Sequence, residues 1–289
     1  MKPPSGVMTA GGGGMKVALY NPLSLRQPSR MNEMSLAMKG MDIVIVPGTQ
    51  VPAIASSPSH KQQLDKHIVM HFGYRKTAHS NKSAGCSIFL RKGRFREQHL
   101  VETISAPEKL TGRGGAVRLR SGRFDILVIA AYFPPRPPKQ SEFAGWKKTV
   151  DLLAAWVHNV IQHAKQRSLI VLGTDLNDAF GYQMVEGIAS ATVSSALGAH
   201  PYAVEGYAAA KLRELLEMEH MMVADTVHKV GPTYYGSTGS TSNIDHICLP
   251  QGALPILKKC YTCPSLARKL QVIPDSVLRD HVPVVVELE

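Results

Sequence analysis

The sequence has few cysteines and no long apolar run. The 289 residues include four cysteines, Cys86, Cys248, Cys260 and Cys263, a number that is typical of proteins from a reducing compartment. No apolar stretch approaches the roughly 18 residues that a membrane span needs, and the start "MKPPSGVMTAGGGGMK" lacks the apolar core of a secretory signal. We therefore expect an intracellular protein, nuclear or cytoplasmic, without a membrane partner.

Acidic residues are scarce relative to basic ones. Lysine and arginine outnumber aspartate and glutamate by 33 to 22, which gives a formal net charge of +11. An excess of this size favours polyanionic partners, nucleic acid first, although the charges are scattered and form no single tract. We expect DNA or RNA as a partner, and nothing in the composition points to an obligate protein partner.

The chain is long enough for one large domain. We predict a flexible, Gly-rich leader over residues 1–14 and a folded domain over residues 15–289. Short apolar runs recur along this domain and predict strands. They are "KVALY", "DIVIV", "HIVMHF", "CSIFLRK", "GAVRLR", "FDILVIAAYF", "LIVLGTD", "IDHICL" and "VPVVVEL".

Helical spacing of apolar residues appears in fewer places. One helix is expected from Ser29, which is placed to cap it, to about Gly40. A longer amphipathic stretch follows at residues 145–166, and a shorter one at residues 207–220. The small-residue-rich segment from Gly181 to Glu205 has the composition of an inserted loop. Many strands with few helices, in no strict alternation, predict an α+β fold of two packed β-sheets with helices outside.

Polar residues of a restricted kind stand at the ends of five predicted strands. A single polar strand end is an ordinary turn. Five of them, all of types that bind a hard cation or transfer protons, indicate an active site. The residues are Asn21, Tyr132, Asp175 with Asn177, Asp245, and Asp280 with His281.

Seven segments resemble, in order, the sequence blocks of the endonuclease/exonuclease/phosphatase superfamily of divalent-metal phosphodiesterases. They are "LYNPLSL", "MDIVIVPGTQ", "AGCSIFLRKG", "VIAAYFPP", "VLGTDLNDAFG", "STSNIDHI" and "LRDHVPVVVEL". The resemblance implies a four-layer α/β/β/α sandwich, in which two mixed sheets pack face to face with helices outside. It places the active site at one edge of that sandwich.

The resemblance also assigns roles to the polar strand ends. Asp175 and Asn177 would orient the attacking water and contact the phosphate. Asp280 would be a metal-linked carboxylate, and His281 would lie at the scissile phosphate with Asp245 orienting its ring. A histidine held by an aspartate has a fixed tautomer and is more basic, which suits this role.

The two remaining strand-end residues, Asn21 and Tyr132, would line the metal and the phosphate by the same resemblance. Asn21 and Asp280 are thus the expected metal ligands, and Tyr132 joins the catalytic group. Mg²⁺, or Mn²⁺ in its place, takes oxygen ligands and keeps several waters, so one or two carboxylates suffice. Such a site supplies the aligned water, proton acceptor and cationic stabilisation that phosphodiester hydrolysis requires.

One departure from the family pattern concerns the metal. The second family block carries a glutamate that binds the metal directly, and Gly48 stands at that position here. Strand alternation would place Gln50, which has an oxygen but no charge, on the same side as Gly48. We therefore expect a weakened metal site. An alternative reason for the glycine is its backbone, since Pro47 and Gly48 together suit a turn with positive φ.

Three functions remain compatible with the sequence. The first is a metal-dependent nuclease of the type found in retroelements, and the second is a phosphatase of small or lipid phosphate esters. The third is an inactive relative that serves as a basic nucleic-acid-binding module. Two weaker signals do not point to zinc: "CYTC" lacks a second ordered pair, and "HIVMH" lacks the glutamate of a zinc-protease motif.

Overall fold

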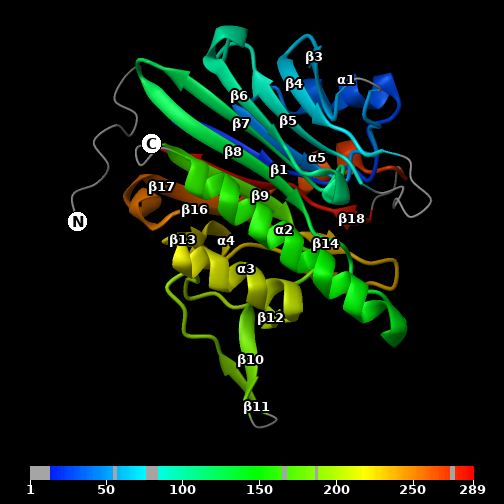
Figure 1. Ribbon diagram of the computed structural model, residues 1–289, viewed down its shortest axis with the longest axis vertical. Helices are drawn as coiled ribbons and strands as arrows, with labels where there is room; N and C mark the ends of the chain where they lie inside the picture. The colour runs from blue at the N-terminus through cyan, green and yellow to red at the C-terminus, as the bar shows by residue number, and fades with distance from the viewer. Residues whose placement is uncertain (1–13, 55–56, 76–83, 165–167, 186–187, 274–276) are drawn as a thin grey trace.

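The structure, a computed structural model, describes residues 14–54, 57–75, 84–164, 168–185, 188–273 and 277–289. Two large β-sheets pack face to face, and helices cover the outer side of each (Figure 1). The four-layer α/β/β/α sandwich is therefore confirmed. Apart from Gly14, the expected leader lies outside the described residues.

The first large sheet is mixed. β1 and β2 are parallel, and every other neighbouring pair is antiparallel. Its order is β17 (Leu257–Thr262), β19 (Val284–Leu288), β1 (Met15–Leu19), β2 (Ile43–Pro47), β5 (Cys86–Arg91), β4 (His67–Phe72) and β3 (Ser59–Gln63).

The second large sheet is mixed as well. Only β8 and β9 are parallel among its pairs, so the ends of these two strands meet at the same edge. Its order is β13 (Met221–Val223), β16 (Asp245–Pro250), β9 (Leu169–Asp175), β8 (Phe124–Tyr132), β7 (Gly114–Ser121) and β6 (Leu100–Ser105).

Five α-helices and four short 3₁₀-helices lie within the described residues. The α-helices are α1 (Pro28–Ala37), α2 (Phe143–His163), α3 (Tyr207–Met218), α4 (Ala224–Val227) and α5 (Pro264–Leu270). The 3₁₀-helices are η1 (Glu97–His99), η2 (Glu108–Leu110), η3 (Gln140–Glu142) and η4 (Gln251–Ile256). No helix of this part of the chain is long and apolar enough to cross a membrane.

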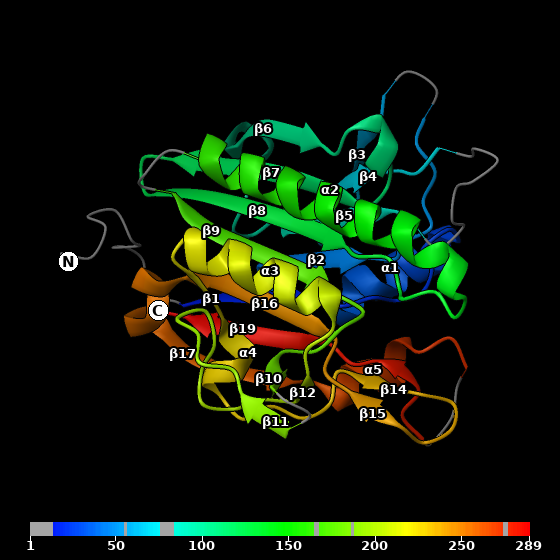
Figure 2. The ribbon, with the colours of Figure 1, turned by 60° about the horizontal axis from the view of Figure 1, so that its bottom comes forward.

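Three apolar clusters hold the four layers together. The largest lies between the sheets, and a second joins α2 and α3, which run side by side, to the β6–β9 side (Figure 2). The third packs α1 and α5 on the first sheet. The predicted stripe of α2 is buried in the second cluster, as the spacing indicated, and Met31, Met34 and Met38 are buried in the third.

Two local expectations were wrong. α1 begins with Pro28 at its first turn and Gln27 as N-cap, so Ser29 lies inside the helix and caps nothing. Proline at this position replaces a capping side chain because its fixed φ suits the helix start and its missing N–H would have no partner there. The helix ends at Ala37, three residues before Gly40.

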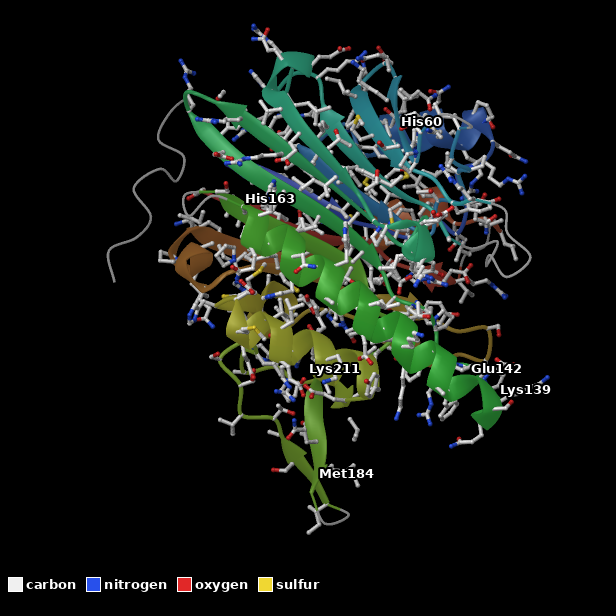
Figure 3. All side chains as sticks on the ribbon, viewed as in Figure 1. His60, Lys139, Glu142, His163, Met184 and Lys211 are labelled. Atoms are coloured by element: carbon white, nitrogen blue, oxygen red, sulfur yellow. The ribbon has the colours of Figure 1, made fainter. Side chains whose placement is uncertain are left out.

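The segment from Gly181 to Glu205 is also more ordered than the expected loop. It contains a small three-stranded sheet of β11 (Ile188–Ala191), β10 (Gly181–Val185) and β12 (Ala203–Val204). The β10–β11 hairpin projects from the body, with Met184 near its tip (Figure 3). A second small sheet of β15 (Thr241–Ser242), β14 (Tyr234–Tyr235) and β18 (Asp280–His281) lies near the ends of β9 and β16.

The two histidines of "HIVMH" are buried on β4 and held by hydroxyl groups. His67 Nδ1 lies 2.9 Å from Ser35 Oγ, and His71 Nδ1 lies 2.7 Å from Ser87 Oγ. Burial lowers the pKa of His67 to about 4 and that of His71 to about 3. Both are neutral core residues, in agreement with the absence of a zinc motif.

These histidines should make the fold acid-sensitive. In the unfolded chain they titrate near pH 6.5, whereas the folded state keeps them neutral, so their contribution is complete above that pH and is lost as pH falls. We expect roughly 2 kcal/mol lost per histidine between pH 6.5 and 5. Urea unfolding of the parent and of His67→Gln and His71→Gln at both pH values measures this, with His163→Gln, an exposed residue, as control. Equal pH slopes in all four proteins would contradict the assignment.

Candidate active site

The predicted polar strand ends meet at one edge of the sandwich. In the second sheet, Tyr132 is the register partner of Asp175, which in turn is paired with Asp245. β16 is antiparallel to β9, so its first residue lies beside the last residue of β9. β18 brings His281 to the same place by pairing with β14.

A buried line of three side chains forms the centre of this edge. His281 Nδ1 lies 2.8 Å from Asp245 Oδ2, and His281 Nε2 lies 3.8 Å from Asp175 Oδ2. The ring of Tyr234 packs edge-on against His281 with the centroids 5.1 Å apart. Asp245 therefore fixes the Nδ1 side of the His281 ring and turns Nε2 towards Asp175.

Two asparagines hold the Asp175 carboxylate. Asn21 Nδ2 donates to Asp175 Oδ2 at 2.8 Å, and the backbone N–H of Asn177 donates to Asp175 Oδ1 at 3.2 Å. The amide oxygen of Asn21 accepts from the backbone N–H of Leu23 at 2.8 Å. Asn177 adopts a φ of +53° and donates its side-chain amide to the Phe133 carbonyl. These bonds fix the direction of the carboxylate.

Burial and neighbouring charges shift the pKa of two members of this group, Asp175 and His281. Burial, followed by repulsion from Asp245, raises the pKa of Asp175 above that of an ordinary aspartate. Burial alone would lower the pKa of His281, but attraction to Asp245 and then Asp175 outweighs burial and raises it. A carboxyl group with a raised pKa beside a histidine with a raised pKa is an arrangement that can accept and donate protons.

The donor set at this edge fits a divalent cation. Asp175, Asp245 and His281 offer ligand atoms within 4.8 Å of one another, and they are the only such group among the described histidines, cysteines and acidic residues. Asp245 Oδ1 is buried without a hydrogen-bond partner. A buried carboxylate oxygen without a partner is costly unless a cation or water meets it.

The other predicted residues lie close to this group. Asp280 is half-buried, has a φ of +61° and is near enough for its charge to raise the pKa of His281. Tyr132 is buried, with the Arg113 guanidinium 5.5 Å from its ring centroid. Asp178, which follows Asn177, turns away: it accepts from the backbone N–H groups of Gly206 and Ala209 at the start of α3.

Comparison with solved structures identifies the fold. The chain matches the AP endonuclease LMAP from Leishmania major with a TM-score of 0.66 and 12% identity, over 96% of this chain and 88% of that one. It also matches the endonuclease domain of TRAS1, a telomere-specific non-LTR retrotransposon (TM-score 0.53, 15% identity, 95% and 98% covered). The chain has the endonuclease/exonuclease/phosphatase fold.

A third neighbour of the same fold is the 3′ phosphatase NExo from Neisseria bound to a product DNA hairpin, with a TM-score of 0.62 and 17% identity, over 95% of this chain and 99% of that one. No family model and no curated protein matches the sequence. The fold that the seven sequence blocks imply is thus confirmed by three-dimensional similarity rather than by overall sequence identity.

Arg113 is a residue near this site that the strand-end pattern did not reveal. It precedes β7, and its guanidinium donates to the Tyr132 carbonyl at 3.3 Å. The charges of Tyr132, Cys86 and Asp175 act on it, which places a cation beside Asp175 and Tyr132. The signal was weak because Arg113 stands at the start of a strand and not at the end of one.

Gly48 departs from the acid expected in this fold for a steric reason. Its φ is +71°, and a Cβ at this position would lie 2.3 Å from Asn21 Oδ1. The space next to Gly48 is therefore occupied by the amide that holds Asp175. The expectation for Gln50 was wrong, because β2 ends at Pro47 and Gln50 has a φ of +55°, so strand alternation does not continue to it.

Gly48→Glu should consequently destabilise the protein without tightening metal binding. A side chain at positive φ costs about 1 kcal/mol or more, and displacing Asn21 would release the Asp175 carboxylate. Gly48→Ala is the matched control, since it adds the Cβ without the acid. Melting temperatures and Mg²⁺ titrations of all three proteins measure both effects. A Gly48→Glu protein that is as stable as the parent and binds Mg²⁺ more tightly would contradict this account.

Proposed function

We propose that the chain is a divalent-metal-dependent phosphodiester hydrolase that acts on nucleic acid, most closely an endonuclease. The observation that carries the proposal is the buried line from Asp245 through His281 to Asp175, with one Asp245 oxygen left unpartnered. The net charge of +11 supports a polyanionic substrate. The neighbours named as endonucleases and as a phosphatase bound to DNA support the same reaction class.

The residues divide the chemistry between them. Asp175, directed by Asn21 and Asn177, accepts the proton of the attacking water, and its raised pKa suits a base at neutral pH. His281, kept protonated by Asp245, presents Nε2–H to a phosphate oxygen as negative charge develops there. Tyr132 and Arg113 add a hydroxyl and a cation beside the phosphate.

A Mg²⁺ or Mn²⁺ ion would be held by carboxylate and amide oxygens at this edge. The sequence points to Asp280 and Asn21, and the unpartnered oxygen of Asp245 offers a further donor. When bound, the ion supplies Lewis-acid stabilisation of charge on the phosphate oxygens. With Gly48 in place of an acid, we expect weak affinity for the metal ion, because the site lacks the negative charge of one carboxylate.

A cleavage assay tests the proposal directly. We expect nicking of plasmid DNA, or cleavage of single-stranded DNA or RNA, with Mg²⁺ or Mn²⁺ and none with EDTA. A generic phosphodiester, run in parallel, reports the alternative of a phosphatase of small or lipid esters. If no substrate is cleaved at any metal concentration while nucleic acid still binds, the chain is a binding module and the hydrolase proposal is wrong.

A further inference from the structure

A pocket of about 630 Å³ lies beside the catalytic group at the N-terminal ends of α2 and α3. Pockets of roughly 300–1,000 Å³ take small organic ligands. Figure 3 shows Lys139 and Glu142 at this end of α2, which extends past the body of the molecule. The lining residues that matter are Arg136, Phe143, Trp146, Lys147, Asn177 and Tyr207.

Three aromatic rings form the wall of this pocket. The Phe143 and Trp146 rings are 6.2 Å apart and tilted by 52°, and the Trp146 and Tyr207 rings are 5.8 Å apart and tilted by 53°. Trp146 Nε1 donates to the Pro134 carbonyl at 2.9 Å, which fixes the indole. All three rings are half-buried, so part of the surface of each ring is accessible to a ligand.

Two exposed cations stand at the rim, and neither has an acidic partner among the described residues. The Arg136 guanidinium lies 4.8 Å from the Phe143 ring centroid, and Lys147 Nζ lies 4.9 Å from that of Tyr207. The two carboxylates in the lining are already engaged. Asp178 accepts from backbone N–H groups of α3, and Glu205 pairs with Arg213 at 3.0 Å.

Asn177 connects the pocket to the catalytic group. It lines the pocket, and its backbone N–H donates to Asp175. A ligand in the pocket is therefore adjacent to a phosphate held at Asp175 and His281. Aromatic rings for stacking, cations without an acidic partner and a neighbouring phosphate site are together the requirements of a nucleotide.

We propose that this pocket binds one unpaired nucleobase of the nucleic acid, with its flanking phosphates at Arg136 and Lys147. The proposal rests on the proposed function, whose substrate it narrows to nucleic acid with an unstacked nucleotide next to the cleaved bond. The three rings offer surfaces on which any base can stack, so we expect stacking rather than base identity to supply the affinity.

Binding to three duplexes of one sequence, with EDTA present, tests this pocket. One is fully paired, one carries a single unpaired thymidine, and one carries an abasic tetrahydrofuran at the same place. We expect the unpaired base to bind about tenfold more tightly than the other two, in the range of one base–aromatic stack. Phe143→Ala should abolish this preference, whereas Leu152→Ala, exposed on the same helix, should keep it.

Tryptophan fluorescence gives a second measurement on the unaltered protein. The chain has two tryptophans, and Trp156 is buried in the core, so quenching by the unpaired base should come from Trp146 and vanish in Trp146→Phe. Equal affinities for the three duplexes, or no quenching, overturn the pocket proposal. If Mg²⁺-dependent cleavage persists in that case, the proposed function stands. Base preference without cleavage supports the pocket and overturns the hydrolase, and no binding of any duplex overturns both.

Discussion

Asp175→Asn is expected to reduce cleavage by about 100-fold or more, the typical contribution of a positioned proton acceptor. The amide keeps the shape of the side chain and can still accept from the Asn177 N–H, but it loses the hydrogen bond from Asn21 and takes up no proton. Because burial and Asp245 already disfavour the charged carboxylate, the neutral replacement should cost little thermal stability. Turnover of a Mg²⁺-dependent substrate and the melting temperature, measured on one preparation, check both parts.

The control for this substitution is Asp125→Asn at the opposite end of β8. Asp125 pairs with Arg118 and accepts from Ser168 Oγ, far along the strand from Tyr132. Its replacement should leave turnover within about twofold of the parent, as expected of surface changes away from a site. Unchanged turnover of folded Asp175→Asn would mean that "TDLN" is an ordinary strand-end turn.

The part of this site that the sequence predicted consists of polar residues at the ends of strands that lie side by side. Asp175 could be recognised because an apolar, β-branched run stops directly before it. Asp245 starts its strand instead, and it meets Asp175 because β16 is antiparallel to β9. Only the family resemblance placed Asp245 in the same site as Asp175 from sequence. Arg113 has the same kind of position before β7, and no motif marked it.

Three missed strands of the two large sheets have a common physical cause. β3, β6 and β17 are edge strands, and each carries exposed or half-exposed polar residues. An edge strand need not be apolar on both faces, and charged residues there prevent pairing with other chains. Their sequences, "SHKQQ", "LVETIS" and "LKKCYT", therefore lack the apolar runs that marked the inner strands.

Backbone conformation at Gly48 was the other feature that sequence left open. The family pattern indicated a lost metal ligand, and the dipeptide Pro47–Gly48 equally allowed a turn. The positive φ of Gly48 and the Asn21 amide beside it favour the turn. The Asn21 amide also holds Asp175, so the residue at position 48 affects both the metal site and the base. Only the three-dimensional structure shows this coupling.

The largest loss should follow removal of His281, and its dependence on Asp245 is the sharpest test of the site. His281→Ala is expected to lower turnover by about 1,000-fold, since removing one stabilising donor from developing charge costs about 100- to 1,000-fold. Asp245→Ala should cost a similar amount, because an unfixed ring no longer presents Nε2–H. The double variant should be little worse than His281→Ala, as residues that act as one unit are not additive.

Asp245→Asn adds a readout that a structural role would not move. Attraction to Asp245 raises the pKa of His281, and activity requires the protonated ring, so activity falls as pH rises through that pKa. Removing the charge lowers the pKa, and the alkaline limb of the pH–rate profile should move to lower pH. An alkaline limb that stays in place would show that Asp245 does not tune His281.

A second aspartate–histidine pair, Asp225 with His246, provides the matched control for Asp245 and His281. His246 follows Asp245 on β16, and its Nδ1 lies 2.9 Å from Asp225 Oδ2, nearly the geometry of the Asp245–His281 contact, but both residues are wholly buried away from solvent. Asp225→Asn breaks this second pair. It should lower the free energy of unfolding by about 3–5 kcal/mol, because one buried charge loses its partner. The remaining folded protein should keep the pH–rate profile of the parent. Strictly additive losses at Asp245 and His281, or a shifted profile in Asp225→Asn, would show that the two pairs do not differ in kind and that the catalytic assignment of His281 is wrong.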